Sequence, residues 1–164
     1  MNNYYRKGAM GALLDEYEKA VEEFKTVVSG ISTEELLNIK VKNDSTASGL
    51  WSLQEILAHV VSSGYSYCVY IIGSRGVVIE RPERQLRSSA KEYLKDINEM
   101  FKYSCGHLSL FGEDELEETD PSKKILTSWG QVYDIEQMME HAIVHILRHR
   151  RHVVRLLSAN RGES

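Results

Sequence analysis

The chain has 164 residues, of which 42% are hydrophobic and 27% charged, a composition typical of a globular protein with a buried core. We therefore expect a single domain spanning residues 1–164. The formal net charge of -4 gives no reason to expect nucleic acid or an acidic membrane surface as a partner.

Cysteine usage and the N-terminal sequence indicate the compartment. Cys68 and Cys105 are too few for a disulfide framework, and free thiols suit a reducing environment. The first ten residues, MNNYYRKGAM, lack the apolar core of a signal peptide, and we expect no apolar run long enough to span a bilayer. These features predict a cytoplasmic protein without a membrane partner.

The first third of the chain shows one long helical pattern. Apolar residues recur at three- and four-residue spacing from Ala12 to about Val28, which predicts a helix. Ser32 and Glu35 have the spacing of a capping box and should open a short helical turn through Leu37. The segment 38–50 is rich in Asn, Ser, Thr and Gly, and we predict a loop there.

Three more long helices are predicted, over Ser52–Ile72, Ser88–Tyr103 and Asp134–Ser158, and the first and last of these also begin with capping boxes. Residues 77–79 could form a brief extended piece, but no sheet is expected. The acidic and then mixed segment Gly112–Gly130 reads as a long connection that could shape one end of a pocket. Four long helices joined by loops predict an all-α, antiparallel four-helix bundle.

The last helix carries four histidines at steps of four, four and three residues: His141, His145, His149 and His152. Because a helix turns about 100° per residue, all four lie in one narrow stripe beside the apolar face. Charged imidazoles packed this closely would repel one another, whereas a bound metal keeps its ligands neutral. We favour a metal site over the alternatives, a pH-sensing cluster or a partly wet basic surface.

The stripe alone leaves the ligand pair open. His141 with His145 and His145 with His149 are both suitable i,i+4 pairs, and His149 with His152 is a weaker option. We expect His59 as the third ligand, because it lies about two turns into its own helix, a depth that suits His145 and His149.

Short polar side chains share the face of His59, where a solvated helix would normally carry Lys and Glu: Ser62, Ser63, Ser66 and Tyr70. Such residues leave room for a ligand, as the wall of a cavity would. The alternative is an ordinary amphipathic helix with a serine-rich, wet flank. Glu55 is the one carboxylate near His59 on this helix, and we assign it to the capping box.

Two motifs in this order resemble those of the DinB/YfiT-like superfamily of four-helix bundles, and the resemblance covers nearly the whole chain. The first is LWSLQEILAHV, from Leu50 to Val60, and the second is HAIVHILRHR, from His141 to Arg150. In that family a histidine on the second helix and an HxxxH pair on the last helix bind a divalent metal. The resemblance therefore implies His59, His145 and His149 as ligands.

Two departures separate this chain from the family pattern. The usual Arg-Gly-Gln after the histidine pair is Arg150-Arg151-His152 here, which adds an imidazole near the site. Ser62 and Ser63 stand where family members often have an acidic residue. We expect metal binding to survive both changes.

The resemblance also implies a function. Some relatives conjugate low-molecular-weight bacterial thiols, so we expect a metal-dependent S-transferase that uses Zn²⁺ or Ni²⁺, a small thiol and an electrophile. Arg148 could hold a carboxylate of the thiol. The alternatives are a metal-dependent hydrolase and a non-catalytic metal-binding or stress-related protein.

Relatives often dimerise, so a homodimer is also expected. The pocket residues would be Ser62, Ser63, Ser66, Tyr70, His141, Arg148 and His152.

Overall fold

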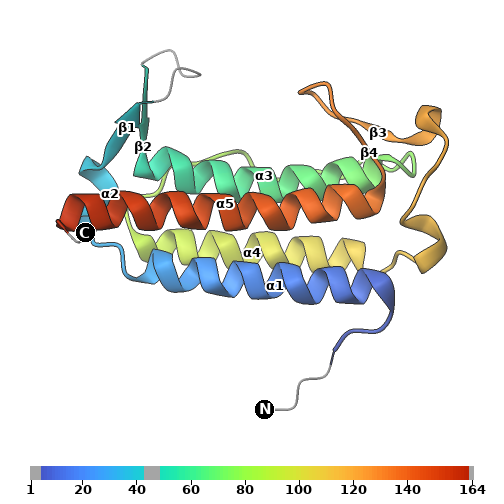
Figure 1. Cartoon of the computed structure of the whole chain (residues 1–164), viewed down its shortest axis with the longest axis horizontal. Coiled ribbons are helices and arrows are strands. Elements are labelled where there is room, and N and C mark those ends of the chain that lie inside the picture. The colour runs from blue at the N-terminus through green and yellow to red at the C-terminus, as the bar shows by residue number, and fades with distance from the viewer. Residues whose placement is uncertain (1–4, 43–48, 163–164) are drawn as a thin grey trace.

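A computed structural model of the chain describes residues 5–42 and 49–162. Four long helices form the bundle, and a short helix, α2 (Thr33–Asn38), follows the first of them (Figure 1). The long helices are α1 (Gly8–Ser29), α3 (Leu53–Gly73), α4 (Ala90–Leu108) and α5 (Ile135–Arg161). The predicted all-α four-helix bundle is therefore confirmed, and the capping boxes predicted at α2, α3 and α5 are all formed.

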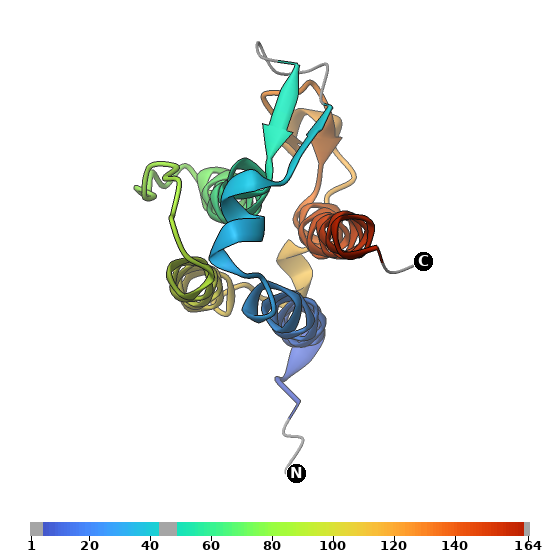
Figure 2. The same cartoon turned by 90° about the vertical axis from the view of Figure 1, so that its left-hand side faces the viewer.

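The helices form a square in which α1 and α3 each pack against both α4 and α5 (Figure 2). One apolar stripe from each helix fills the centre, as the sequence periodicity requires. The largest fully buried side chains include Tyr17 and Phe24 of α1, Ile56 and Ile71 of α3, and Tyr93 and Ile97 of α4.

The helix directions are mixed. At the C-terminal end of α5, Arg161 Nε donates to Glu35 Oε1 at 2.6 Å, close to the end of α1, so these two neighbours run parallel (Figure 1). The helices α3 and α4 also run parallel, because residues 74–89 return along the bundle between them. The antiparallel arrangement expected from the sequence holds for α1 with α4 and for α3 with α5, the pair that carries the histidines (Figure 1).

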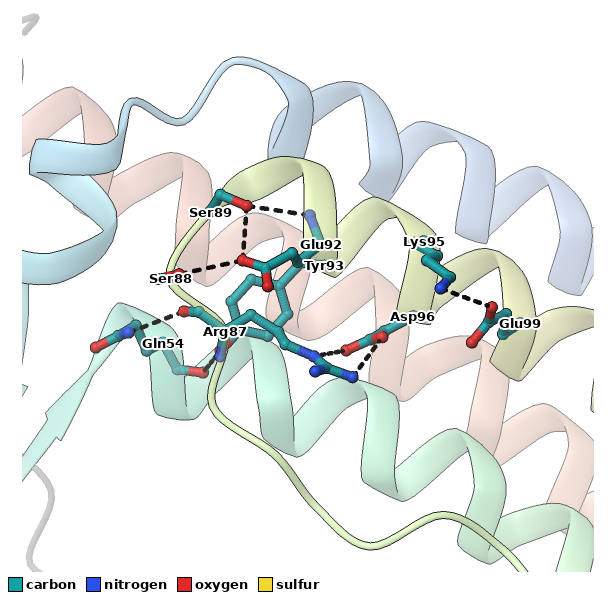
Figure 3. Close-up of polar contacts among 9 residues, drawn as sticks. All are labelled: Gln54, Arg87, Ser88, Ser89, Glu92, Tyr93, Lys95, Asp96 and Glu99. Atoms are coloured by element: carbon teal, nitrogen blue, oxygen red, sulfur yellow. Dashed lines mark hydrogen bonds and ion pairs between the residues drawn. The ribbon is translucent and has the colours of Figure 1, made fainter.

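The returning connection is fastened where α3 and α4 begin (Figure 3). Arg87 Nε and Nη2 donate to the carboxylate of Asp96 at 2.7 and 3.0 Å. Gln54 Nε2 donates to the Arg87 carbonyl at 2.8 Å, and the Tyr93 hydroxyl accepts from Arg87 N and donates to the Gln54 carbonyl. These contacts hold residues 74–89, called the return segment below, against the two helices.

Two small hairpins correct the prediction of plain loops. The strand β1 (Lys40–Lys42) pairs with β2 (Leu50–Ser52), and β3 (Ile125–Leu126) pairs with β4 (Val132–Tyr133), both antiparallel. Both hairpins rise from the side of the bundle formed by α3 and α5 (Figures 1 and 2). Strands of two or three residues are too short to show an alternating pattern. Part of the predicted loop, residues 43–48, lies outside the described residues.

Helix ends also differ from the prediction. The first helix begins at Gly8 rather than Ala12, and α4 continues to Leu108, so Cys105, Gly106 and His107 lie within a helix. The last helix extends to Arg161, where Gly162 ends it with a positive φ of 70°. A positive φ is accessible to glycine because it has no Cβ, which makes it a common helix stop.

By length and composition alone, α3 is apolar enough to cross a membrane, which corrects the expectation that no apolar run reaches that length. Core helices of soluble proteins meet the same criterion, and 56% of the apolar window of α3 is buried within the bundle. Its apolar side packs against both α4 and α5. We therefore assign α3 to the core of the domain.

Candidate metal centre

The antiparallel pair α3 and α5 brings three histidines together. His59 lies in α3, and His145 and His149 lie one turn apart in α5. The Nε2 atoms of His59 and His145 are 3.0 Å apart, and one nitrogen from each of the three rings lies within 4.8 Å of the others. The ring centroids are separated by 4.4 to 5.1 Å. We call these three residues the histidine triad.

Burial keeps the triad uncharged. His145 and His149 are only 4% and 7% exposed, and burial lowers the pKa of His145 to about 2 and that of His149 to about 3. The pKa of His59 falls to about 4, first through burial and then through the positive charges of Arg84 and Arg148. A neutral imidazole offers a lone pair to a metal, so all three side chains are in the ligating form at neutral pH.

The donor set suits a divalent metal ion. A tetrahedral zinc ion with Zn–N distances of about 2.0–2.1 Å separates its nitrogen ligands by roughly 3.3 Å, close to the 3.0 Å between His59 and His145. The Nδ1 atoms of His145 and His149 are buried without a hydrogen-bond partner among the described residues. An ion held by His145 Nε2 would leave the Nδ1 of that ring unpaired, because the two nitrogens of one imidazole point in different directions, so the support for a metal is the convergence of the three rings.

The hairpin β1–β2 closes one side of the triad. Trp51 of β2 makes edge contacts with His59 and His149 at ring-centroid distances of 5.2 and 5.9 Å. It is placed by the strand register, in which Trp51 pairs with Val41, and by Ser52, which caps α3 directly after it. The indole therefore shields the triad from solvent on this side.

An open cleft of about 510 Å³ lies on another side of the triad and includes His59 and His145 in its lining. Small hydroxyl side chains of α3, Ser63 and Ser66, line its wall. Tyr67 joins them and packs its ring against His145 at 5.6 Å. Burial raises the pKa of Tyr67 to about 12, so its phenol remains protonated at neutral pH.

The hairpin β3–β4 supplies the outer wall of this cleft. The Trp129 ring stacks on His141 at 5.8 Å with an interplanar angle of 24°. Two hydrogen bonds hold the ring there. Ser128 N donates to the Tyr70 hydroxyl at 2.9 Å, and Trp129 Nε1 donates to Gln131 Oε1 at 3.0 Å. Trp129 remains 44% exposed, so one part of its surface is available to a bound molecule.

The structure places most of the expected pocket residues on the cleft and two elsewhere. The residues on the cleft are Ser63, Ser66, Tyr70, His141 and Arg148. Ser62 faces the return segment, where its Oγ accepts from Arg81 Nη1 at 3.1 Å. His152 is partly buried one turn beyond the triad and does not line the cleft.

Sequence reasoning missed several residues of the cleft: Tyr67, Arg81, Ser128, Trp129 and Gln131. Tyr67 falls on the core side of a helical wheel, and its buried ring still reaches the cleft at the border of that side. The others lie in irregular segments without periodicity. The one available signal was the segment 112–130, expected to shape one end of a pocket, which contributes Ser128 and Trp129.

Comparison with known sequences places this architecture in a family. A search among curated proteins finds no match to the chain. The family model of the DinB superfamily matches residues 16–153. This range contains the whole triad, all of α3 and α4, and most of α1 and α5. The chain therefore belongs to the DinB superfamily.

Proposed function

We propose that this protein is a divalent-metal-dependent S-transferase that joins a small thiol to an electrophile. The observation that carries the proposal is the convergence of three neutral imidazoles from two helices next to an open cleft. Three histidine ligands leave positions free for a substrate, as catalytic rather than structural zinc sites do. Zn²⁺ and Ni²⁺ are the candidate ions, because imidazole suits both.

Each part of the site has a task in such a reaction. A divalent ion held by the triad would lower the pKa of a substrate thiol and so provide the thiolate nucleophile at neutral pH. Trp51 keeps water from the buried side of the rings, which preserves their neutral form. Tyr67 remains protonated beside His145 and can donate a hydrogen bond to a group that gains negative charge.

Thiol transfer is favoured over hydrolysis because the described residues of the cleft include no carboxylate to act as a base. Glu55 is the nearest candidate on α3, and its Oε2 accepts from Ser52 N at 2.7 Å in the capping box. That hydrogen bond lowers the pKa of Glu55 and makes it a weaker base. We also propose a reducing cytosol as the compartment, since Cys68 and Cys105 are free thiols.

Elemental analysis combined with a conjugation assay tests the proposal. Purified protein is loaded with zinc or nickel and incubated with a panel of low-molecular-weight thiols and monochlorobimane. We expect about one metal per chain and conjugation that disappears in His59→Ala. The matched control is His107→Ala, because His107 lies on α4 outside the triad, with its Nδ1 2.9 Å from the Tyr103 carbonyl oxygen.

The outcomes separate the competing functions. Metal retention without conjugation of any thiol would leave a metal-binding protein without turnover and overturn the transferase. Conjugation that continues in His59→Ala would exclude the triad as its site.

A further inference from the structure

We infer that the cleft beside the triad selects a substrate that carries a carboxylate, which Arg81 and Arg148 bind, and this assignment rests on the proposed function. The two arginines come from different elements, the return segment and α5, and both line the cleft next to His59 and His145.

Arg148 directly precedes His149 in α5 and faces the triad from the open side. It lines the cleft together with His59, His141 and His145, and its positive charge contributes to the lowered pKa of these three rings. It forms no ion pair with any described carboxylate. The guanidinium is exposed to the cleft and free to bind an anion in a bidentate manner.

Arg81 reaches the same cleft from the return segment. Its Nη1 donates to Ser62 Oγ at 3.1 Å, and the neighbouring Glu80 carbonyl accepts from the Tyr103 hydroxyl at 2.6 Å. The segment is held further along by Arg87 and Asp96 (Figure 3). Arg81 therefore sits in a fixed stretch of backbone, although it has no carboxylate partner among the described residues.

The lining of the cleft contains two arginines and no acidic side chain among the described residues. Outside the cleft, Arg84, Arg151 and Arg155 have no ion pair among the described residues, and five arginines pair with a carboxylate: Arg6 with Asp15, Arg75 with Glu115, Arg87 with Asp96, Arg150 with Glu23 and Arg161 with Glu35. Arg84 adds a third positive charge near His59. A divalent ion would raise the positive charge further, so a substrate anion is the complement that this cleft lacks.

Trp129 and the size of the cleft narrow the ligand further. A volume of about 510 Å³ suits a small molecule, and the partly exposed indole offers a flat apolar surface. The cleft therefore suits a compact molecule with an apolar portion against Trp129 and a carboxylate near Arg81 and Arg148.

A pair of ligands of nearly equal shape tests the role of charge without any thiol. Isothermal titration calorimetry on zinc-loaded protein compares 3-phenylpropionate with its neutral amide, 3-phenylpropanamide. We expect the acid to bind at least tenfold more tightly. The preference should fall to within about twofold in Arg81→Ala/Arg148→Ala, whereas Arg151→Ala, an exposed arginine of α5 outside the cleft, should keep it.

Trp129→Ala should weaken the binding of 3-phenylpropionate and of its amide by a similar factor, because it removes the apolar wall of the cleft and leaves both arginines in place. Equal binding of acid and amide to the wild type would overturn the inference, whatever the conjugation assay shows. A preference that persists in the double variant would also overturn it, because the carboxylate would then be bound by the metal. Failure of conjugation alone would count against the thiol chemistry and leave the measured charge preference intact.

Discussion

His59 and His145 are 86 positions apart in the sequence, and their Nε2 atoms lie 3.0 Å apart in the folded protein. The two nitrogens meet because α3 and α5 pack against each other and run in opposite directions (Figure 1). Two unprotonated nitrogens at this distance would repel each other. Either one ring donates its N–H to the other, or both lone pairs point at a shared cation.

Replacing single histidines should reveal which of them hold the metal. We expect His145→Ala and His149→Ala to weaken zinc binding by at least about 100-fold, since loss of a ligand exceeds the 10–100-fold effect typical of an outer partner. His141→Ala should change zinc affinity by less than about threefold, because His141 is not one of the three clustered rings. Competition with a chromogenic chelator measures all three variants.

His141→Ala also serves as the control for folding, since it lies on the same helix and the same stripe. A loss of zinc in His141→Ala as large as that in His149→Ala would replace the triad with a different pair of ligands.

The helices and the common face of His145 and His149 could be predicted from the sequence because both depend on local periodicity, whereas the choice of His59, His145 and His149 as a set came from the resemblance to the family motifs. His145 and His149 are four residues apart, and that spacing determines their common face as soon as the segment is helical. The capping residues Ser52 and Asp134 mark where α3 and α5 begin, and depth along each helix then follows from the rise per residue.

The remainder of the cleft depends on tertiary contacts. Arg81 reaches it through a return segment whose course is determined by Arg87, Asp96 and Tyr103, none of which is close to His59 in sequence. Trp129 lies in the turn between β3 and β4, which is held by the hydrogen bond from Ser128 N to the hydroxyl of Tyr70 in α3. No pattern in the irregular segments predicts these contacts, which explains why both residues were missed.

The metal-free protein should lose stability in mild acid. Burial lowers the pKa of His59 to about 4, His149 to about 3 and His145 to about 2, whereas unfolded histidine titrates near 6.5. Above about pH 6.5 both states are neutral and the triad causes no pH dependence. As the pH falls from about 6.5 toward 4, the unfolded chain takes up protons that the folded protein does not, so the free energy of unfolding decreases.

Urea unfolding in the presence of a chelator, at several pH values between 7.5 and 4.5, measures this decrease. His149→Leu should reduce the proton uptake on unfolding by about one, because one buried imidazole is absent. An unfolding free energy with the same pH dependence in His149→Leu would show that other groups cause the acid sensitivity.

Gly64→Ala should destabilise the bundle by about 1–3 kcal/mol, the usual range for overpacking a core. A Cβ at Gly64 would lie 2.3 Å from Met100 Sδ, and Met100 is fully buried between α3 and α4. The matched control is Gly106→Ala on α4, where a Cβ meets nothing within 4 Å. That change should be neutral or stabilising by up to about 1 kcal/mol, because alanine favours helix.

The double variant Gly64→Ala/Met100→Ala tests the cause of the effect. If the clash with Met100 is responsible, urea unfolding should show that the double variant is destabilised by less than the sum of the destabilisations of Gly64→Ala and Met100→Ala measured singly. Full additivity would mean that the added methyl group acts elsewhere.

Asp96→Asn should increase the local opening of the return segment and have little effect on the free energy of unfolding of the whole protein. The Arg87 to Asp96 pair lies near the surface, so its loss should lower the free energy of unfolding by about 1 kcal/mol or less. Residues 74–89 lose one of their fastenings, and hydrogen exchange measured by mass spectrometry should rise there (Figure 3). Because Arg81 lies in this segment, the preference of the cleft for 3-phenylpropionate over its amide should also fall.

The neighbouring pair Lys95 and Glu99 supplies the control. Lys95 Nζ and Glu99 Oε1 lie 3.8 Å apart on the exposed face of α4 (Figure 3). Lys95→Ala should leave the hydrogen exchange of residues 74–89 and the preference for 3-phenylpropionate unchanged. If Asp96→Asn raises the exchange of residues 74–89 while the preference for the acid stays at its wild-type value, Arg81 does not bind the carboxylate. Arg148 alone would then account for the selection, because it is carried by α5 and is independent of the return segment.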